Sequence, residues 1–253
     1  MYKTLLLFFL LLHMIGDYYL QSDSMADEKN ANHAALQKHG LIYAAVFIAL
    51  TAAVWNWPVL IAAAALAILH YGVDILKTEY LRKHTVTEPS DSLEAYTYCI
   101  DQGLHLLFLF AAVLLLKVLA VSAAAYPYCS TVCEFLPVAP FLLLRWVCLL
   151  AFLWKPANIT IKVLTSKYKP AKNAQDSSKD KAGAFIGSLE RMIILLLMSV
   201  GQYAAIGLVL TAKSVARYKK ISEDQSFAEY YLLGTLLSTL LAIAAYFILI
   251  LYL

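Results

Sequence analysis

Long runs of apolar residues alternate with shorter polar stretches along nearly the whole chain. Seven of these runs are long enough to cross a hydrocarbon core of about 30 Å, which takes about 20 helical residues. The runs lie near residues 4–20, 40–56, 58–76, 101–121, 136–154, 189–211 and 230–252. The pattern therefore predicts an all-α fold, a polytopic transmembrane helical bundle of about seven spans.

Composition agrees with a chain that lies in a lipid bilayer. Of the 253 residues, 62% are hydrophobic and 15% are charged, whereas soluble domains carry about 25% charged residues. Mean hydropathy is +0.69. The net charge of +3 is dispersed along the chain, and no basic stripe with interleaved aromatic residues points to a nucleic-acid partner. The sequence indicates no oligomeric state.

The polar positions also divide the chain into parts. Residues 155–184 include "SKYKPAKNAQDSSKDKAG" and are basic and polar, as a flexible connection would be. We predict a five-span N-terminal unit over 1–155, a basic linker over 156–184 and a two-span C-terminal unit over 185–253. The four residues from Trp55 to Pro58 predict a tight hairpin between the second and third spans. No small-residue cleavage site follows the first span, so we expect it to be retained.

Lysine and arginine positions predict the orientation, because basic loops resist translocation. The loops after the first, third and fifth spans carry 12 of these residues, and the opposite side carries 6. The N-terminus is therefore predicted outside and the C-terminus in the cytoplasm. The basic segment Lys213–Lys220 would then lie outside, unless 155–228 contains an additional or re-entrant segment. Cys129 and Cys133 would also lie outside, where a disulfide can persist.

Polar residues inside the spans form a repeated pattern. Three pairs of one histidine and one aspartate stand four residues apart, so that each pair shares a helix face: His13 with Asp17, His70 with Asp74, and Asp101 with His105. The first and third spans end on the membrane side where the fourth begins, so all three pairs lie at a similar depth. His39 opens the second span at that level, and Gln21 and Lys77 extend two of the stripes.

Such a cluster has the chemistry of a metal site, because imidazole nitrogens and carboxylate oxygens from facing helices bind divalent ions. The predicted ligands are His13, Asp17, His39, His70, Asp74, Asp101 and His105. Zinc is the leading candidate, with manganese or iron as alternatives. Seven groups exceed one tetrahedral set, so either two metals bind or some aspartates support the ligands and act as general base. We expect the rings of His13, His70 and His105 to lie within about 12 Å of one another.

The leading functional hypothesis is a membrane-embedded, metal-dependent hydrolase that acts on a lipid-linked or phosphoester substrate. A bound metal would acidify a water molecule and polarise the bond to be broken. Gln21 and Lys77 are candidate catalytic residues that would steady developing negative charge. The alternatives are a transporter or ion- or proton-conducting protein that uses the same cluster, and a non-catalytic membrane subunit in which imidazole and carboxylate only satisfy each other. Glu190 and Arg191 either line the same cavity or pair together.

Several segments carry a resemblance to a known family. "HMIGDYYLQSD", "HYGVDILK" and "DQGLH", together with the C-terminal "IGSLERMIILLLMSVGQYAAIGLVLTAKSVARYKK" and "FAEYYLLGTLLS", resemble a bacterial membrane family known as domain of unknown function 3307. The resemblance implies a multi-pass protein of the bacterial inner membrane. It implies no particular activity, so the enzymatic hypothesis depends on the polar residues themselves.

Overall fold

A computed structural model describes residues 1–29, 32–85, 91–122, 125–126, 138–170 and 177–253. These residues form helices and short connections, and they contain no strand. Six helices are long and apolar enough to cross a membrane. The predicted all-α polytopic bundle is confirmed, and its surroundings are a lipid bilayer. The chain divides into two compact units, Met1–Cys148 and Leu149–Leu253.

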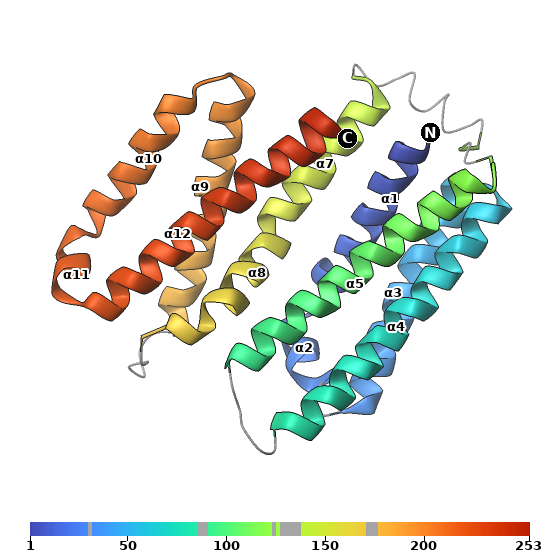
Figure 1. Ribbon diagram of the computed structural model, residues 1–253, viewed down its shortest axis with the longest axis horizontal. Helices are drawn as coiled ribbons and strands as arrows, with labels where there is room; N and C mark the ends of the chain where they lie inside the picture. The colour runs from blue at the N-terminus through green and yellow to red at the C-terminus, as the bar shows by residue number, and fades with distance from the viewer. Residues whose placement is uncertain (30–31, 86–90, 123–124, 127–137, 171–176) are drawn as a thin grey trace. The chain divides into compact units, whose positions relative to one another are not determined.

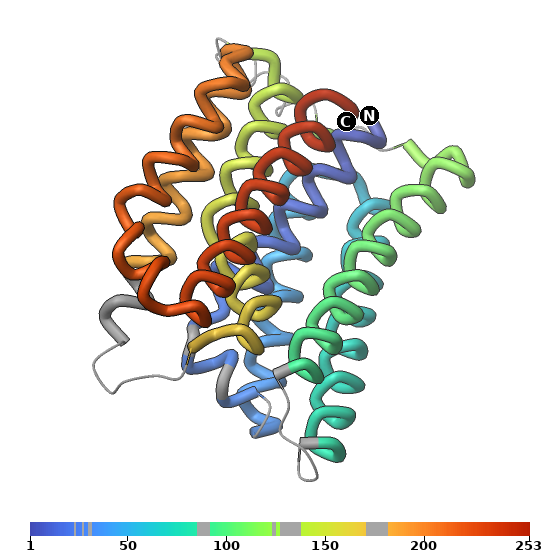
Figure 2. The backbone as a smooth tube through the Cα atoms, turned by 60° about the vertical axis from the view of Figure 1, so that its left-hand side comes forward, coloured from blue at the N-terminus to red at the C-terminus, as the bar shows by residue number. Residues whose placement is uncertain are grey.

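The first unit is a bundle of long helices with one short helix at its edge (Figures 1 and 2). Its complete elements are α1 (Tyr2–Met14), the π-helical turn η1 (Ile15–Tyr19), α2 (Asp23–Lys29), α3 (His33–Val54), α4 (Trp57–Thr85) and α5 (Asp91–Val118). Helix α1 packs against α3 and α5, and α4 also packs against both. The short helix α2 packs against α3. The first predicted span, 4–20, is thus a regular helix that ends in a π-turn.

Local sequence explains where the helices of this unit begin and end. The Asn32 side chain accepts a hydrogen bond from the backbone N–H of Ala34 at 2.9 Å and so caps the start of α3. Helix α3 ends at Val54 and α4 begins at Trp57, with Pro58 in the first turn, where its missing N–H costs nothing. The predicted tight hairpin between these two spans is confirmed.

The buried residues of the first unit change from apolar to polar at one level. An apolar core fills the part of the bundle near the start of α1, around Phe9, Phe47 and Val113. Beyond it, towards the end of α1 and the start of α5, the buried residues include histidines and aspartates. The polar cluster therefore adjoins the apolar core inside the same bundle. Its residues lie at one end of the bundle, as the crossing directions of the helices predict.

The second unit consists of the end of α7 and of helices of 6 to 23 residues that include α12. Its elements are α7 (Pro140–Trp154, shared with the first unit), α8 (Pro156–Thr165), the 3-10 turn η2 (Ser166–Tyr168), α9 (Ser177–Ser199), α10 (Tyr203–Ala216), α11 (Tyr218–Glu223), α12 (Gln225–Tyr246) and the π-turn η3 (Phe247–Tyr252). Helix α8 lies within the stretch predicted as a polar linker. Cys129 and Cys133 lie outside the described residues.

The predicted single span over 189–211 is instead two helices. Helix α9 ends at Ser199, and the chain turns at Gly201. The φ of Gly201 is +72°, a backbone conformation that glycine adopts at little cost. The backbone N–H of Gln202 donates to the carbonyl of Leu197 at 2.8 Å, which closes the end of α9. Helices α9 and α10 then pack as an antiparallel hairpin (Figure 1).

Glu190 and Arg191 have separate partners in the second unit. The buried Arg191 guanidinium donates to the carbonyl of Leu153, the amide oxygen of Asn158 and the hydroxyl of Ser238, at 2.9, 2.6 and 3.0 Å. It thereby joins α7, α8 and α12 to α9. The carboxylate of Glu190 pairs with Lys213 of α10. Both residues therefore hold helices of this unit together.

Candidate metal centre

All seven predicted ligands are buried in the first unit, each with no more than 9% of its surface exposed. They come from α1 and its π-turn, from α3, from α4 and from α5. The ring centroids of His13 and His70 lie 5.8 Å apart, those of His13 and His105 5.3 Å, and those of His70 and His105 4.2 Å. The predicted convergence of these three imidazoles is confirmed, whereas their roles as ligands stay predictions.

Four side-chain atoms crowd together at the centre of this cluster. The Nε2 atom of His39 lies 3.3 Å from Nε2 of His70, 3.3 Å from Oδ1 of Asp17 and 3.3 Å from Oδ2 of Asp74. The Nε2 atom of His70 lies 3.9 Å from the same oxygen of Asp17 and 3.8 Å from that of Asp74. Two nitrogens and two oxygens from two helices, α3 and α4, and from the π-turn η1 thus point towards one small region.

These separations match the edges of a metal coordination sphere. With metal–ligand bonds of about 2.0–2.1 Å, neighbouring ligands of a tetrahedral zinc ion lie about 3.3–3.4 Å apart. The three separations that involve His39 have this length, and the two from His70 are slightly longer. The atoms that these residues would not use as ligands, Nδ1 of both histidines and Oδ1 of Asp74, are buried without a hydrogen-bond partner among the described residues, so the fit depends on the separations alone. The residues present therefore fit a divalent ion.

His13 differs from the other three histidines of the cluster, His39, His70 and His105, because both of its ring nitrogens have partners. Nε2 lies 3.2 Å from Oε1 of Gln102, and Nδ1 lies 3.1 Å from the hydroxyl of Tyr43. An amide oxygen only accepts, so Nε2–H donates to it, and Nδ1 of the neutral ring accepts from Tyr43. The amide nitrogen of Gln102 donates to Oδ2 of Asp17 at 2.9 Å. His13 thereby helps to orient Asp17 through Gln102, and Oδ1 of Asp17 still faces His39.

Tyr43 fixes the ring of His70 and is itself fixed by a close helix approach. The two rings stack with centroids 3.6 Å apart and planes 3° from parallel. Tyr43 also lies against Gly16 in the π-turn, where an added Cβ would meet the Tyr43 ring at 2.7 Å. Glycine therefore permits the contact between η1 and α3. Single π-turns inside helices are often found at functional sites, and this one carries Asp17.

A second group of ligand atoms adjoins the first. Ligand atoms of His13, Asp17 and His105, and those of His70, Asp74 and His105, lie within 4.8 Å of one another. Both ring nitrogens of His105 and Oδ1 of Asp101 are buried without a hydrogen-bond partner in the described ranges. The other oxygen of Asp101 accepts from Lys77 at 2.8 Å and from Gln102 at 3.1 Å. The cluster thus has donor atoms for a second ion beside the first.

The candidate catalytic residues lie at the edge of the cluster. Lys77 is bound to Asp101, and Oε1 of Gln21 accepts from the ammonium of Lys29 at 3.5 Å. Lys29 also lies 3.5 Å from Oδ2 of Asp74. Burial alone would lower the pKa of Lys29, but the nearby carboxylates of Asp74 and Asp17 outweigh burial and raise it. Lys29 therefore remains an ammonium ion at neutral pH.

Sequence reasoning missed three residues of the cluster. Gln102 follows Asp101 directly. The feature that could have identified it is an uncharged amide at the polar end of a span. Tyr43 stands four residues after His39, on the same helix face. Lys29 gave no signal, because a lysine in a polar segment between spans ordinarily contacts water. All three act through hydrogen bonds, stacking or charge on residues that the sequence did identify.

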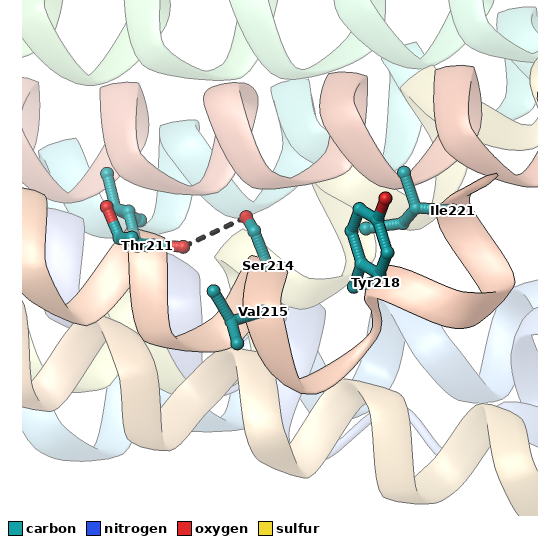
Figure 3. Close-up of a pocket in the computed structure, with 6 residues that line it drawn as sticks. Thr211, Ser214, Val215, Tyr218 and Ile221 are labelled. Carbon is teal, nitrogen blue, oxygen red and sulfur yellow. Dashed lines mark hydrogen bonds between the residues drawn. The ribbon is translucent and has the colours of Figure 1, made fainter.

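A pocket in the second unit has different chemistry. It has a volume of about 380 Å³ and lies where α10 meets α11 (Figure 3). Thr211, Ser214 and Tyr218 supply its hydroxyl groups, and Ser214 donates to the carbonyl of Leu210 at 3.0 Å. No acid, imidazole or cysteine is among the described residues that line it. We assign no reaction to this pocket.

Comparison with known proteins gives one family match. A family described as protein of unknown function (DUF3307) matches residues 5–132, which include every predicted ligand of the cluster. The C-terminal segments that resemble the same family lie beyond the matched residues. No curated protein and no solved structure matches the chain.

Proposed function

We propose that this chain, which belongs to the DUF3307 family, binds a divalent metal ion inside the membrane and uses it in hydrolysis. The observation that carries the proposal is the set of separations near 3.3 Å around Nε2 of His39. Asp17, His39 and His70 place one ligand atom each within 4.8 Å of one another, as ligands of one ion would, and Asp74 lies beside them, 3.3 Å from His39. The ligands are His39, His70, Asp17 and Asp74. Zinc fits this nitrogen and oxygen set, and manganese or iron are alternatives.

The remaining polar residues support these ligands. Gln102 and His13 hold Asp17, and Tyr43 holds the ring of His70. Such supporting contacts fix ligand orientation and often change metal affinity 10–100-fold. His105 and Asp101 extend the site and provide for a second ion or a general base. When bound, the metal would supply an acidified water and polarise a phosphoryl or carbonyl oxygen. Lys77 and Gln21 lie at the edge, where a lipid-linked or phosphoester substrate would present its negative charge.

Burial of the cluster favours a second candidate, a transporter or a cation- or proton-conducting protein. His39, His70 and Asp74 expose no more than 2% of their surface. A large substrate reaches them only if helices separate, whereas an ion or a proton needs a much smaller opening. Ionisable groups that face a bundle interior are common in ion pathways. A subunit without activity, in which the cluster only fixes helix packing, is the third candidate.

Elemental analysis of detergent-purified protein tests metal binding. After supplementation with zinc or manganese and removal of the free ion, we expect about one ion bound per chain at the first group of ligands. Hydrolysis of a phosphoester by the loaded protein would support the enzyme. Uptake of the same ion into protein-containing vesicles, without hydrolysis, would support transport. If the supplemented protein holds no metal, the metal proposal is wrong and proton conduction or the packing role takes its place.

The membrane and orientation belong to the same proposal. The family resemblance supports the bacterial inner membrane, and the lysine and arginine positions support an N-terminus on the outer side. The cluster then lies near the cytoplasmic side, towards α2. A substrate or ion would arrive from the cytoplasmic side of the membrane.

A further inference from the structure

Two ammonium groups lie at the cluster, and they come from different kinds of helix. Lys77 is part of α4, which is long and apolar enough to span the membrane. Lys29 is the last residue of α2, a seven-residue helix that is not one of the candidate spans. Its side chain is nevertheless buried, with 7% of the residue exposed. A residue from outside the spans thus places a charge inside the bundle.

The charges of the cluster balance only in certain combinations. Asp17, Asp74 and Asp101 supply three negative charges, and Lys29 and Lys77 supply two positive ones. Imidazoles that ligate a metal are neutral, so in the metal-bound state these five groups contribute a sum of −1. A divalent ion added to this set gives +1, whereas a divalent ion that replaces one lysine gives zero. Because uncompensated charge is costly in a membrane interior, exchange of a lysine for the ion is favoured over simple addition.

Contact lengths indicate which lysine leaves. The ammonium of Lys77 lies 2.8 Å from Oδ2 of Asp101, a normal charge-assisted hydrogen bond. The ammonium of Lys29 lies 3.5 Å from its two acceptors, Gln21 and Asp74. Its acceptor atom on Asp74 is the oxygen that also lies 3.3 Å from Nε2 of His39. Lys29 thus makes longer contacts than Lys77 does, and one of them is to an atom that the metal would use.

We propose that Lys29 is a displaceable counter-ion of the metal centre. Its ammonium offsets part of the carboxylate charge when the metal is absent, and α2 carries it out of the bundle when a divalent ion binds. This inference rests on the proposed metal binding, and it deepens that proposal by naming the group that the ion replaces.

Zinc affinity of two matched variants gives the first test. Lys29→Met keeps the length of the side chain and removes its charge, and Lys38→Met does the same at an exposed position of α3. Competition with a zinc chelator in detergent measures affinity. We expect Lys29→Met to bind zinc at least tenfold more tightly than the parent chain, and Lys38→Met to bind it equally. Equal or weaker binding by a folded Lys29→Met protein would overturn the inference.

Trypsin cleavage of the unmodified chain gives a second test that needs no variant. Lys29 should resist trypsin without metal and become cleavable when zinc or manganese is bound. Cleavage after Lys83, which is exposed in any case, serves as the internal control. If metal binds but cleavage after Lys29 does not rise relative to Lys83, the displacement is wrong while metal binding stands. If the chain binds no metal, both proposals fail, and elemental analysis separates these two outcomes.

Discussion

At the scale of single residues, Asp74 separates a metal ligand from a packing group. Asp74→Asn is nearly isosteric and keeps an acceptor, so a packing role predicts a loss of about 1 kcal/mol in unfolding free energy. A ligand role predicts normal folding with little bound metal, because a negative charge that offsets the cation has gone. We expect the ligand result, measured as metal content and thermal unfolding of purified protein. His70→Ala should bind as little metal, and the double variant scarcely less, because residues of one site are not additive.

The matched control for Asp74 is Glu79→Gln, which removes a carboxylate from an exposed position of the same helix. It should leave metal content unchanged. Full metal occupancy in Asp74→Asn would show that Asp74 is not a ligand, and equal losses in both variants would point to a general charge effect.

Gln102 is a second residue at which stability and metal binding are linked. Gln102→Leu removes the partner of Nε2 of His13 and of carboxylate oxygens on Asp17 and Asp101. Each buried group left unsatisfied costs about 1–3 kcal/mol. We expect the unfolding midpoint in detergent to fall by an amount equivalent to about 2–4 kcal/mol, with a tenfold or greater loss of metal affinity. The control is Gln37→Leu at an exposed position, which should change neither the unfolding midpoint nor the metal affinity. If Gln102→Leu also leaves both quantities at the values of the parent chain, the proposed role of Gln102 is wrong.

At the scale of elements, the contact between the π-turn η1 and α3 sets the position of two ligands. It holds Asp17 on one side and, through Tyr43, the ring of His70 on the other. Gly16 has no room for a methyl group against Tyr43, whereas Gly103 of α5 is exposed and its Cβ would meet nothing within 4 Å. The two glycines therefore form a matched pair for testing this contact.

We expect Gly16→Ala to lower unfolding free energy by about 1–3 kcal/mol, as overpacking does. It should also weaken metal binding, because Tyr43 must shift away from its place on His70. Gly103→Ala should be neutral or stabilising by up to about 1 kcal/mol, since alanine favours a helix. Thermal unfolding and metal content of both variants test this. The contact is dispensable if Gly16→Ala unfolds and binds metal as the parent does.

At the scale of the whole molecule, the hairpin of α9 and α10 changes the expected topology if α10, an apolar helix of 14 residues that is shorter than the six candidate spans, also crosses the membrane. If both helices cross, the basic segment 213–220 returns to the side of the other basic loops. That side then carries 16 lysine and arginine residues against 2 on the other, rather than 12 against 6. The imbalance agrees far better with the preference of basic loops for the cytoplasm. An even number of crossings also places both termini on one side.

We therefore expect the C-terminus outside, together with the N-terminus, in place of the cytoplasmic C-terminus that seven spans imply. A C-terminal alkaline phosphatase fusion should be active, and a reporter inserted within 218–222 should read as cytoplasmic. A reporter after Thr85 serves as the cytoplasmic control. A fluorescent protein that folds at the C-terminus, combined with an inactive phosphatase fusion, would restore the seven-span topology.

The sequence by itself determined the membrane bundle and the level of the polar cluster. Apolar run length decides whether a helix spans a bilayer, and a spacing of four places His70 and Asp74 on one face whatever their neighbours are. Crossing direction follows from chain order, so the shared depth of the three pairs needed no tertiary contact. Hydropathy over the length of a span could not locate the break at Gly201, because the runs before Ser199 and after Gln202 are both apolar and the two together are long enough to be counted as one span.

Only the tertiary structure decided which atoms meet. The rotation of each helix about its axis depends on long-range contacts such as that of Gly16 with Tyr43. These contacts occupy both nitrogens of His13 and bring Nε2 of His39 and of His70 together. They also bring Lys29 into the bundle, although its sequence surroundings are polar. Side-chain type and spacing specify candidates, but hydrogen bonding and charge balance between helices decide which of them remain available to a metal.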